Sequence, residues 1–161
     1  QLPVIKAFGT DIDFFTPGTK KDIEYFYPAT FSPWKRQRDI AYLGDKLLCV
    51  GTVQSDGVED YEACKKKGVR IEEGYFPVEK IRDYYQRAKH VIIPAIHGSE
   101  RTCIESLSCD ISPTVLHPET NRKLYSYIRE FEKSGLSPRE FIIRNYSHIH
   151  FAKQLLKGIE I

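Results

Sequence analysis

The chain has 161 residues, of which 41% are hydrophobic and 29% charged, as expected of one globular domain with its own core. Its 24 basic and 22 acidic residues leave a net charge of +2, too small an imbalance to favour nucleic acid or an anionic membrane as the main partner. No apolar run approaches the ~18 residues of a membrane span, and no signal peptide is recognisable. Because the chain starts at Gln1 and contains no methionine, we expect it to be part of a longer protein.

Apolar runs and turn signals predict strands that alternate with helices along the chain. Residues 1–20 are expected to form a linker that leads into the domain. The expected strands are residues 23–29, 46–50, 69–72, 90–95 and 113–116. The expected helices are residues 35–43, 58–67, 77–88, 100–109 and 124–133, followed by a C-terminal helix within 137–161. Ser137-Pro138-Arg139-Glu140 forms a capping box that begins this last helix.

Short apolar strands separated by helices predict an α/β fold, a Rossmann-like, doubly wound parallel sheet with helices on both faces. We expect the whole chain to be a single domain with the usual strand order, 3-2-1-4-5. The four cysteines match no zinc pattern and are too few for a disulfide framework. They are predicted to be reduced thiols in the core, which favours a cytoplasmic location.

In such a sheet a ligand binds beyond the carboxyl ends of the strands, at the point where the strand order reverses. This order places the loop after the first strand, with Lys35 and Arg36, beside the loop after the fourth strand, residues 96–99. The second loop leads into a helix that carries Arg101, Thr102 and Glu105. The two loops are therefore expected to meet at one site.

The start of that helix is suited to an anion, because the N–H groups of a first helical turn are unpaired and lie at the positive end of the helix dipole. Gly98 allows close approach of the backbone, Ser99 and Thr102 add hydroxyls, and Arg101 and Lys35 add positive charge. One turn later, Glu105 is placed to accept hydrogen bonds from a ribose diol. The pattern predicts a pocket for a nucleoside diphosphate.

The same residues also have purely structural interpretations. Ser99 is a common helix cap, Glu100 suits the first turn of a helix, and Arg101 and Glu105 have the spacing of an ion pair at i,i+4. Sequence alone leaves both interpretations open.

Other ligand chemistries are disfavoured. Residues 51–57 follow a strand but lack the G-x-G-x-x-G of a dinucleotide site and the Gly-Lys-Ser/Thr of a P-loop. No arrangement of nucleophile, histidine and acid is recognisable, although His97 lies in the right loop. Tyr75 and Phe76 follow Gly74 at the end of the third strand, where a nucleotide base could pack.

The chain resembles the C-terminal, donor-binding domain of the retaining GT-B glycosyltransferases of family four, over nearly its whole length. FGTDIDFFTP (8–17) resembles the N-G-V-D-x-x-x-F-x-P linker of that family, and ATFSPWKRQRDI (29–40) its phosphate-binding loop. The segment 69–95 resembles the family's V-x-F-x-G through Y-x-x-A to P-S segment. IIPAIHGSERTCIESLSC (92–109) takes the place of E-G-F-G-L-T-x-x-E-A-M-A-C-G-x-P-V.

The resemblance implies roles for individual residues. Lys35 matches the lysine that binds the diphosphate, Thr102 the threonine at the helix start, and Glu105 the glutamate used on the ribose. Gly74 and Tyr75 match the turn that meets the base.

The chain also departs from the family pattern. Ala29 or Thr30 stands where the family has an arginine, which Arg36 or Arg101 would replace, and His97 stands where the family's first glutamate contacts the donor sugar. The residues expected in catalysis are Lys35, His97 and Glu105. The residues expected to bind the donor are Lys35, Arg36, Gly74, Tyr75, Phe76, Gly98, Ser99, Glu100, Arg101, Thr102 and Glu105.

The resemblance implies a glycosyltransferase of the hexosyltransferase type that uses a UDP-, GDP- or TDP-sugar, keeps the anomeric configuration and needs no metal or other cofactor. The acceptor, a glycan, lipid or protein, would be held by an N-terminal domain absent from this chain, without which the domain is expected to be inactive. A peripheral membrane association would also come through that missing half. The alternative is a non-catalytic nucleotide- or anion-binding scaffold; an epimerase is disfavoured because no paired acid and histidine groups are recognisable.

Overall fold

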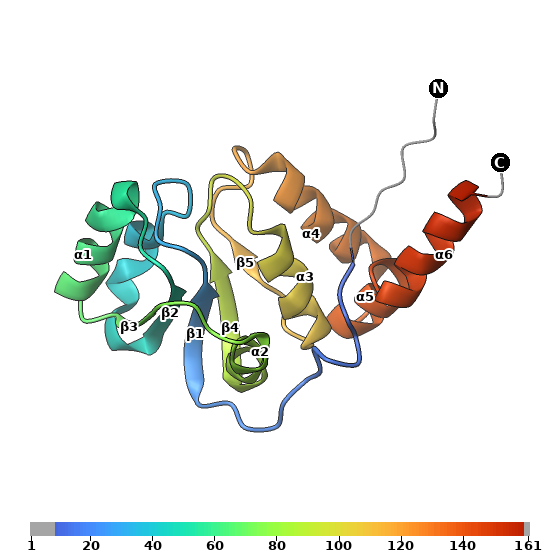
Figure 1. Ribbon diagram of the computed structural model, residues 1–161, viewed down its shortest axis with the longest axis horizontal. Helices are drawn as coiled ribbons and strands as arrows, with labels where there is room; N and C mark the ends of the chain where they lie inside the picture. The colour runs from blue at the N-terminus through green and yellow to red at the C-terminus, as the bar shows by residue number, and fades with distance from the viewer. Residues whose placement is uncertain (1–8, 160–161) are drawn as a thin grey trace.

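Five parallel strands form the centre of the computed structural model, which describes residues 9–159 (Figure 1). The strands are β1 (Ile23–Pro28), β2 (Leu47–Gly51), β3 (Arg70–Glu73), β4 (Ala88–Ile93) and β5 (Thr114–Val115). Each lies within two residues of its expected ends. Their order, β3-β2-β1-β4-β5, confirms the prediction, and in the middle of the sheet Phe26 pairs with Leu48 on one side and Val91 on the other.

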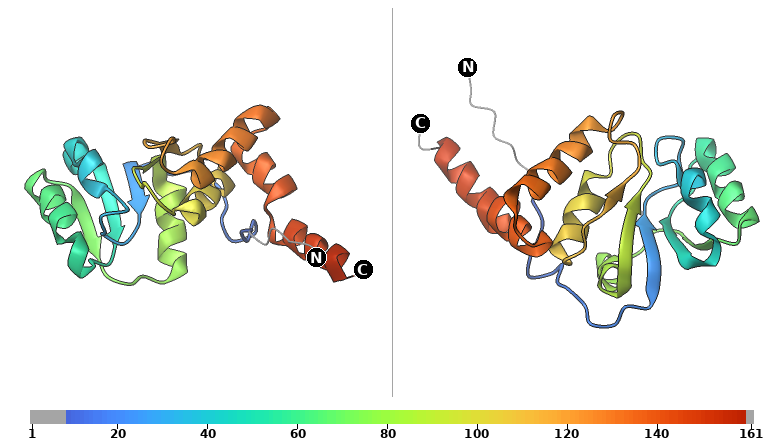
Figure 2. Two further views of the ribbon diagram at one scale, coloured as in Figure 1. Left: turned by 90° about the horizontal axis from the view of Figure 1, so that it is seen from above. Right: turned by 180° about the vertical axis from the view of Figure 1, so that it is seen from behind.

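Helices cover both faces of this sheet. The helices between strands are η1 (Gln37–Lys46), η2 (Ser55–Gly57), α1 (Val58–Lys66), α2 (Val78–Arg87) and α3 (Glu100–Ser108). Because β4 pairs on the far side of β1, the chain reverses direction across the sheet after β3. Right-handed crossovers then put η1 and α1 on one face and α2 and α3 on the other (Figure 2). The doubly wound α/β fold is confirmed.

The core lies on both faces of the central strands. Tyr85 of α2 packs edge-on against Phe26 of β1, with ring centroids 5.1 Å apart, and against Phe15 at 6.0 Å. All four cysteines are buried free thiols, as predicted. The largest fully buried side chains are Tyr27, Tyr85, Phe26, Phe31, Ile23, Ile40, Leu47, Ile93, Ile104, Leu107, Leu124 and Ile142.

The first helix differs from its prediction. Residues 35–43 were expected to be helical, whereas the chain forms the 3-10 helix η1, which begins two residues later. Arg36 precedes it in the left-handed region, with φ of 56°, and Gly44 breaks it with φ of 58° and ψ of −136°. A left-handed residue cannot be part of a right-handed helix, so Lys35 stays in the loop.

The prediction of one C-terminal helix within 137–161 is wrong. After α4 (Arg122–Ser134) the chain forms two helices, α5 (Pro138–Asn145) and α6 (His148–Ile159). The break falls at Ser147, whose hydroxyl accepts the N–H of His150 and so caps a new helix. Only half of the expected capping box forms, because Ser137 accepts the N–H of Glu140 while the Glu140 carboxylate pairs with Arg144.

The expected linker lies against the end of the sheet beside α3 and α5. Residues 9–20 contain no helix or strand, and the linker's first eight residues lie outside the described part of the chain. Arg139 of α5 donates to the carbonyl oxygens of Phe15 and Ile12, each at 2.9 Å, and of Ser108 at 2.8 Å. One guanidinium therefore joins the linker to the end of α3.

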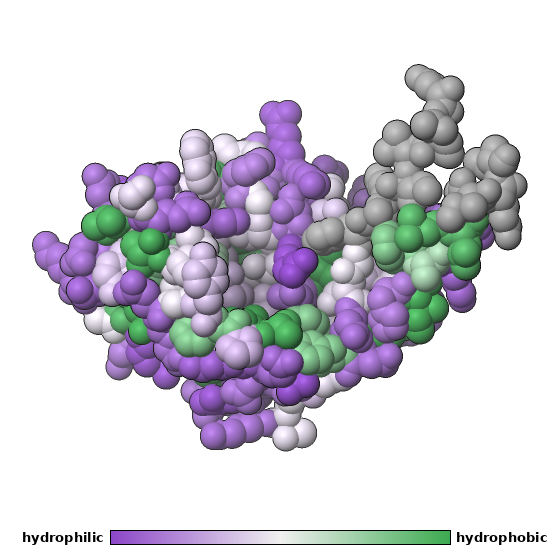
Figure 3. Space-filling view, in the orientation of Figure 1, coloured by the Kyte–Doolittle hydropathy of each residue, from purple (hydrophilic) through white to green (hydrophobic). Residues whose placement is uncertain are grey.

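The surface over α6 carries exposed hydrophobic side chains (Figure 3). Ile149 and Leu156 belong to this surface and are 48% and 61% exposed. Among residues 9–159, no helix is both long enough and apolar enough to cross a membrane.

Candidate functional site

Two loops meet at the carboxyl edge of the sheet, where β1 lies beside β4. The N–H of Ile96 donates to the carbonyl oxygen of Trp34 at 2.9 Å, which joins the loop after β4 to the loop after β1. The ammonium group of Lys35 lies 3.0 Å from the Ser99 hydroxyl oxygen and 3.4 Å from the His97 carbonyl oxygen. The expected meeting of these segments, remote in sequence, is therefore present in the structure.

Gly98 lies directly under the Lys35 ammonium. Its φ is +74°, and a Cβ atom at this position would lie 2.9 Å from Lys35 Nζ. Ser99 follows with φ of 70°, so two consecutive residues are left-handed just before α3 begins. For a serine this conformation is costly, because its Cβ crowds the backbone. Such strain is typical of sites where function fixes the backbone.

The interpretation of Ser99 as a helix cap is wrong. Ser99 is the N-cap residue of α3, but its side chain makes no capping hydrogen bond. Its hydroxyl oxygen lies 3.1 Å from the Tyr27 hydroxyl and 3.0 Å from Lys35 Nζ. The N–H groups of the first turn of α3 therefore receive no side-chain cap and stay open to a ligand.

Lys35 is half-buried and lies at the positive end of α3. Burial lowers the pKa of its ammonium group, and the Glu100 carboxylate opposes this shift. Glu100 is itself shared with Lys123 of α4, whose Nζ lies 3.3 Å from its carboxylate. A partly desolvated lysine beside uncapped N–H groups makes this a region of positive potential.

Two other expected contributors are engaged in the structure. The Thr102 side chain is buried, and its hydroxyl donates to the carbonyl oxygen of Pro28 at 3.4 Å. Arg36 donates through Nε and Nη2 to both carboxylate oxygens of Asp39, at 2.9 and 3.1 Å. His117, from the loop after β5, lies 2.9 Å from the same carboxylate. Lys35, rather than Arg36, is the cation aimed at α3.

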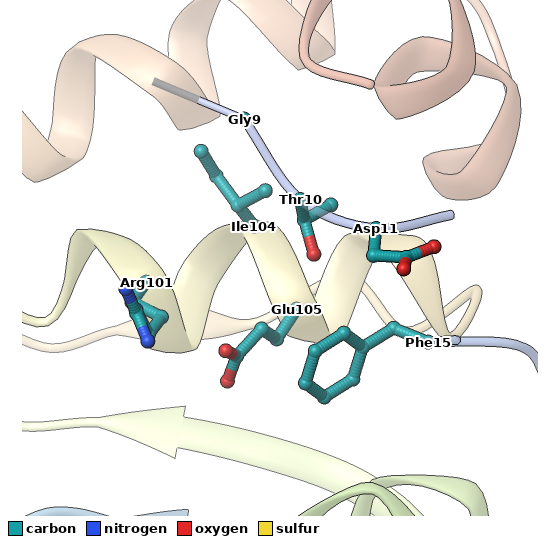
Figure 4. Close-up of a pocket in the computed structure, with 7 residues that line it drawn as sticks. All are labelled: Gly9, Thr10, Asp11, Phe15, Arg101, Ile104 and Glu105. Carbon is teal, nitrogen blue, oxygen red and sulfur yellow. The ribbon is translucent and has the colours of Figure 1, made fainter. Parts of the chain in front are cut away.

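Arg101 and Glu105 line a pocket of about 210 Å³ between α3 and the linker (Figure 4). Gly9, Thr10, Asp11, Phe15 and Ile104 complete its lining. Figure 4 shows the Arg101 and Glu105 side chains on the same side of α3, with the Glu105 carboxylate pointing into the open space. Arg101 and Glu105 form no direct ion pair within the described residues, but the Arg101 charge still attracts the Glu105 carboxylate, so only the direct contact expected of an i,i+4 pair is missing.

Glu105 is only 8% exposed, and burial raises the pKa of its carboxyl group to about 7. The positive charge of Arg101 and a hydrogen bond from Tyr85 act in the opposite direction and lower the pKa. A carboxyl group with a pKa of about 7 is only partly ionised near neutral pH. With a guanidinium beside it, it can therefore both donate and accept hydrogen bonds with a polar ligand such as a sugar diol.

The expected base-binding turn lies at the end of β3. Gly74 has φ of +135°, and its N–H donates to the carbonyl oxygen of Gly51 at 3.1 Å. The Tyr75 side chain is 94% exposed, while Phe76 is half-buried under the Lys80 ammonium, 4.2 Å from the ring centroid. β3 is separated from β1 by β2, so this turn lies along the same sheet edge as Lys35, two strands away.

No protein-family model matches the chain, and no curated protein matches it. Solved structures do match. The C-terminal domain of a group 1 glycosyl transferase from Francisella tularensis has a TM-score of 0.63 at 9% identity, covering 87% of this chain and 100% of that domain. The chain has the fold of the C-terminal domain of GT-B glycosyltransferases.

Two longer structures share this GT-B fold over their matched part. HepE from Anabaena, in complex with UDP and glucose, has a TM-score of 0.64 at 13% identity over 94% of this chain. AviGT4, a glycosyltransferase of avilamycin A biosynthesis, has a TM-score of 0.64 at 15% identity over 92% of this chain. The present chain spans 55% of the length of each of them.

Sequence reasoning missed two residues of this GT-B domain that contact the turn between β4 and α3. The sequence pattern places Tyr27 in an apolar strand and assigns no role to Asn121. The Tyr27 hydroxyl reaches Ser99, and the Asn121 amide donates to the carbonyl oxygens of Ala95 and Gly98, each at 3.0 Å. The sequence signal was the hydroxyl of Tyr27, near the end of the buried strand beside which the strand order reverses; Asn121 had no such signal.

A group of potential metal ligands includes Asp11, which also lines the pocket beside α3. Asp11, Asp13 and His148 bring one ligand atom each within 4.8 Å of one another, and all three are exposed. One carboxylate oxygen of Asp11 already accepts the N–H groups of Asp13 and Phe14, as in an ordinary turn. The arrangement has a structural explanation without an ion.

Proposed function

We propose that the chain is the donor-binding half of a glycosyltransferase that moves a sugar from a nucleoside diphosphate sugar to an acceptor with retention of the anomeric configuration. The diphosphate binds between Lys35 and the start of α3, the ribose meets Glu105, and the base meets the Gly74-Tyr75 turn. An N-terminal domain outside this chain holds the glycan, lipid or protein acceptor. The GT-B fold supports this proposal, as does the solved complex of HepE with UDP and glucose.

One observation carries the proposal: the Lys35 ammonium lies 3.0 Å from Ser99 Oγ, at the uncapped start of α3. A cation at the positive end of a helix is disfavoured, because such a position stabilises anions by about 0.3–1 kcal/mol and penalises cations similarly. Burial of Lys35 adds to that cost, as its lowered pKa indicates. A bound diphosphate reverses both effects, since it pairs with the lysine and with the open N–H groups.

In the proposed reaction the positively charged groups at the start of α3 stabilise the departing diphosphate. The bond between the anomeric carbon and the phosphate oxygen breaks while that carbon bonds to the acceptor hydroxyl oxygen. Negative charge develops on the departing phosphate oxygen, which takes up the acceptor's proton. Lys35, the first N–H groups of α3 and Arg101 lower the barrier by electrostatic attraction. His97, exposed at the rim, is proposed to hydrogen-bond a sugar hydroxyl. The proposal includes no resident metal or cofactor, and the four free thiols favour a cytoplasmic setting.

Calorimetric titration of the chain with UDP, GDP and TDP tests the binding step. We expect micromolar affinity for one of them and a loss of about 10- to 100-fold in Lys35→Ala, as for removal of a charged hydrogen-bond partner. Lys89→Ala is the matched control, because Lys89 pairs with Glu24 on the strands away from this loop cluster. Absence of binding at millimolar concentration of all three nucleotides would contradict the proposal.

A second candidate is a non-catalytic nucleotide- or anion-binding module. The observation that favours it is the state of Arg36, whose guanidinium is held by Asp39 and cannot easily replace the arginine missing at Ala29 or Thr30. The two candidates differ in the full-length protein. A transferase hydrolyses or transfers from the nucleotide sugar whose nucleotide it binds, and Lys35→Ala stops turnover; a scaffold binds the nucleotide with no turnover in either form.

A further inference from the structure

The Gly98-Ser99 turn is held in an unfavourable conformation from two sides. Both residues are left-handed, at φ of 74° and 70°, and α3 starts directly after them. Ser99 gains nothing from capping α3. Contacts from other elements must therefore keep this turn from relaxing.

Asn121 holds the turn from the α4 side. Asn121 is only 3% exposed, and its side-chain amide nitrogen donates to the carbonyl oxygens of Ala95 and Gly98, each at 3.0 Å. Asn121 is the N-cap residue of α4, a position where asparagine usually caps its own helix, yet its side chain makes no capping hydrogen bond. Its amide is used on the turn instead.

The position of Asn121 is itself well fixed. Its backbone N–H donates to the carbonyl oxygen of His117 at 2.9 Å, and its carbonyl oxygen accepts the N–H of Tyr125 at 3.0 Å. Because the Asn121 backbone is fixed, its side-chain amide holds both ends of the segment from Ala95 to Gly98 in place.

Tyr27 holds the turn from the sheet side. The residue is fully buried in β1, at the centre of the sheet, and its hydroxyl lies 3.1 Å from Ser99 Oγ. This contact fixes the same hydroxyl oxygen that Lys35 approaches at 3.0 Å. Ser99 thus fixes the position of the Lys35 ammonium relative to the first turn of α3.

We propose that Asn121 and Tyr27 are positioning residues, which keep Gly98 and Ser99 left-handed so that Lys35 and the first N–H groups of α3 face one diphosphate. The inference rests on the proposed function of the chain. Neither residue touches the ligand. Each acts through the turn, and loss of either one lets Ser99 relax towards an ordinary φ and turns the open N–H groups away from Lys35.

The test compares Asn121→Ala and Tyr27→Phe with Ser106→Ala. Ser106 is a matched control, because it is fully buried on the same helix and its hydroxyl donates to the carbonyl oxygen of Ile111 at 2.8 Å, away from the turn. Tyr27→Phe keeps the aromatic ring in the core and so keeps the fold. Affinities for UDP and inorganic pyrophosphate are measured by calorimetry, well below the unfolding temperature of every variant. The backbone amide resonances of Gly98 and Ser99 are recorded by NMR.

We expect Asn121→Ala to bind both ligands about tenfold more weakly and Tyr27→Phe about fivefold more weakly, with shifted Gly98 and Ser99 resonances in both. Ser106→Ala is expected to melt at a lower temperature with unchanged affinity. Variants that bind like the wild type, or a Ser106→Ala variant that loses as much affinity, would overturn the positioning role alone. A wild type that binds neither ligand would overturn the proposed function, and unchanged resonances in both variants would then overturn the positioning role as well.

Discussion

Two helices, α1 and α3, start at the same edge of the sheet and have their first turns filled in opposite ways. α1 supplies its own negative charge, with Glu59 and Asp60 in its first turn. Arg38 pairs with both of them, and Asp60 is fully buried. The approach to this helix is also closed, because a Cβ on Gly57 would lie 2.0 Å from the Phe31 carbonyl oxygen.

α3 has a cation where α1 has anions. Its one first-turn acid, Glu100, is drawn towards Lys123, and the Lys35 ammonium lies beside Gly98, 3.0 Å from the Ser99 hydroxyl oxygen. The same helix dipole is satisfied inside the protein at α1 and left for a ligand at α3. The difference comes from two nearby cations: Arg38 of η1 pairs with the first-turn acids of α1, whereas Lys35, in the loop before η1, lies at the start of α3.

The largest effect is expected at α1. Asp60→Ala removes three hydrogen bonds from the backbone and guanidinium of Arg38, at 2.9 to 3.1 Å, and should lower the free energy of unfolding by about 3 kcal/mol. Urea unfolding measures this loss. UDP affinity at low temperature should stay unchanged, since α1 has a structural role only. A weakened affinity for UDP would show that the start of α1 also contributes to ligand binding.

At α3 the effect is expected on binding. Gly98→Ala puts a methyl group 2.9 Å from Lys35 Nζ at a φ of +74° and should weaken UDP binding by about 30-fold, as the charged contact is displaced. Gly68→Ala is the control, because Gly68 has φ of +75° with nothing within 4 Å. Both variants should lose about 1 kcal/mol of stability. Equal affinities in the two variants would remove Gly98 from the site.

The pocket lined by Arg101 and Glu105 predicts a pH effect. Burial raises the pKa of Glu105 from its usual 4.5 to about 7, so the native state favours the protonated form. Stability from this group is fully present below about pH 4.5 and is lost as the pH rises through about 7. Glu105→Gln should therefore gain about 2 kcal/mol over the wild type at pH 8, and almost nothing at pH 4, in urea unfolding. A variant less stable than the wild type at pH 8 would contradict this.

The smallest effect is expected at the end of β3. Tyr75 is 94% exposed, so Tyr75→Ala should leave the free energy of unfolding unchanged. Loss of stacking on a base should weaken UDP binding by about fivefold and leave pyrophosphate binding as it was. Equal losses for both ligands, or no loss for either, would place the base elsewhere.

The sheet and the meeting of its loops could be predicted because both follow from patterns in the chain itself. Short apolar strands separated by helices fix a parallel sheet, and the usual strand order then brings Lys35 beside Ser99 without knowledge of any contact. The apolar runs located the strands within two residues.

Features that depend on a single side chain could not be predicted in this way. The C-terminal segment keeps its helical pattern through Ser147, and only the contact of that hydroxyl with His150 reveals a second helix. Ser99 has the identity of a cap, but its hydroxyl is taken by Tyr27 and Lys35, from elements more than 60 residues away. Asn121 likewise reaches across the turn from α4, a contact that no local pattern contains.

The proposed function depends on a diphosphate that binds between Lys35 and the first turn of α3. A crystal structure of the chain grown with UDP would show whether it does. We predict phosphate oxygens within hydrogen-bond distance of Lys35 Nζ and of the backbone N–H groups at Ser99 and Glu100. Phosphate density confined to Arg101 in the pocket beside the linker, with Lys35 still bound only to Ser99 and His97, would contradict the account.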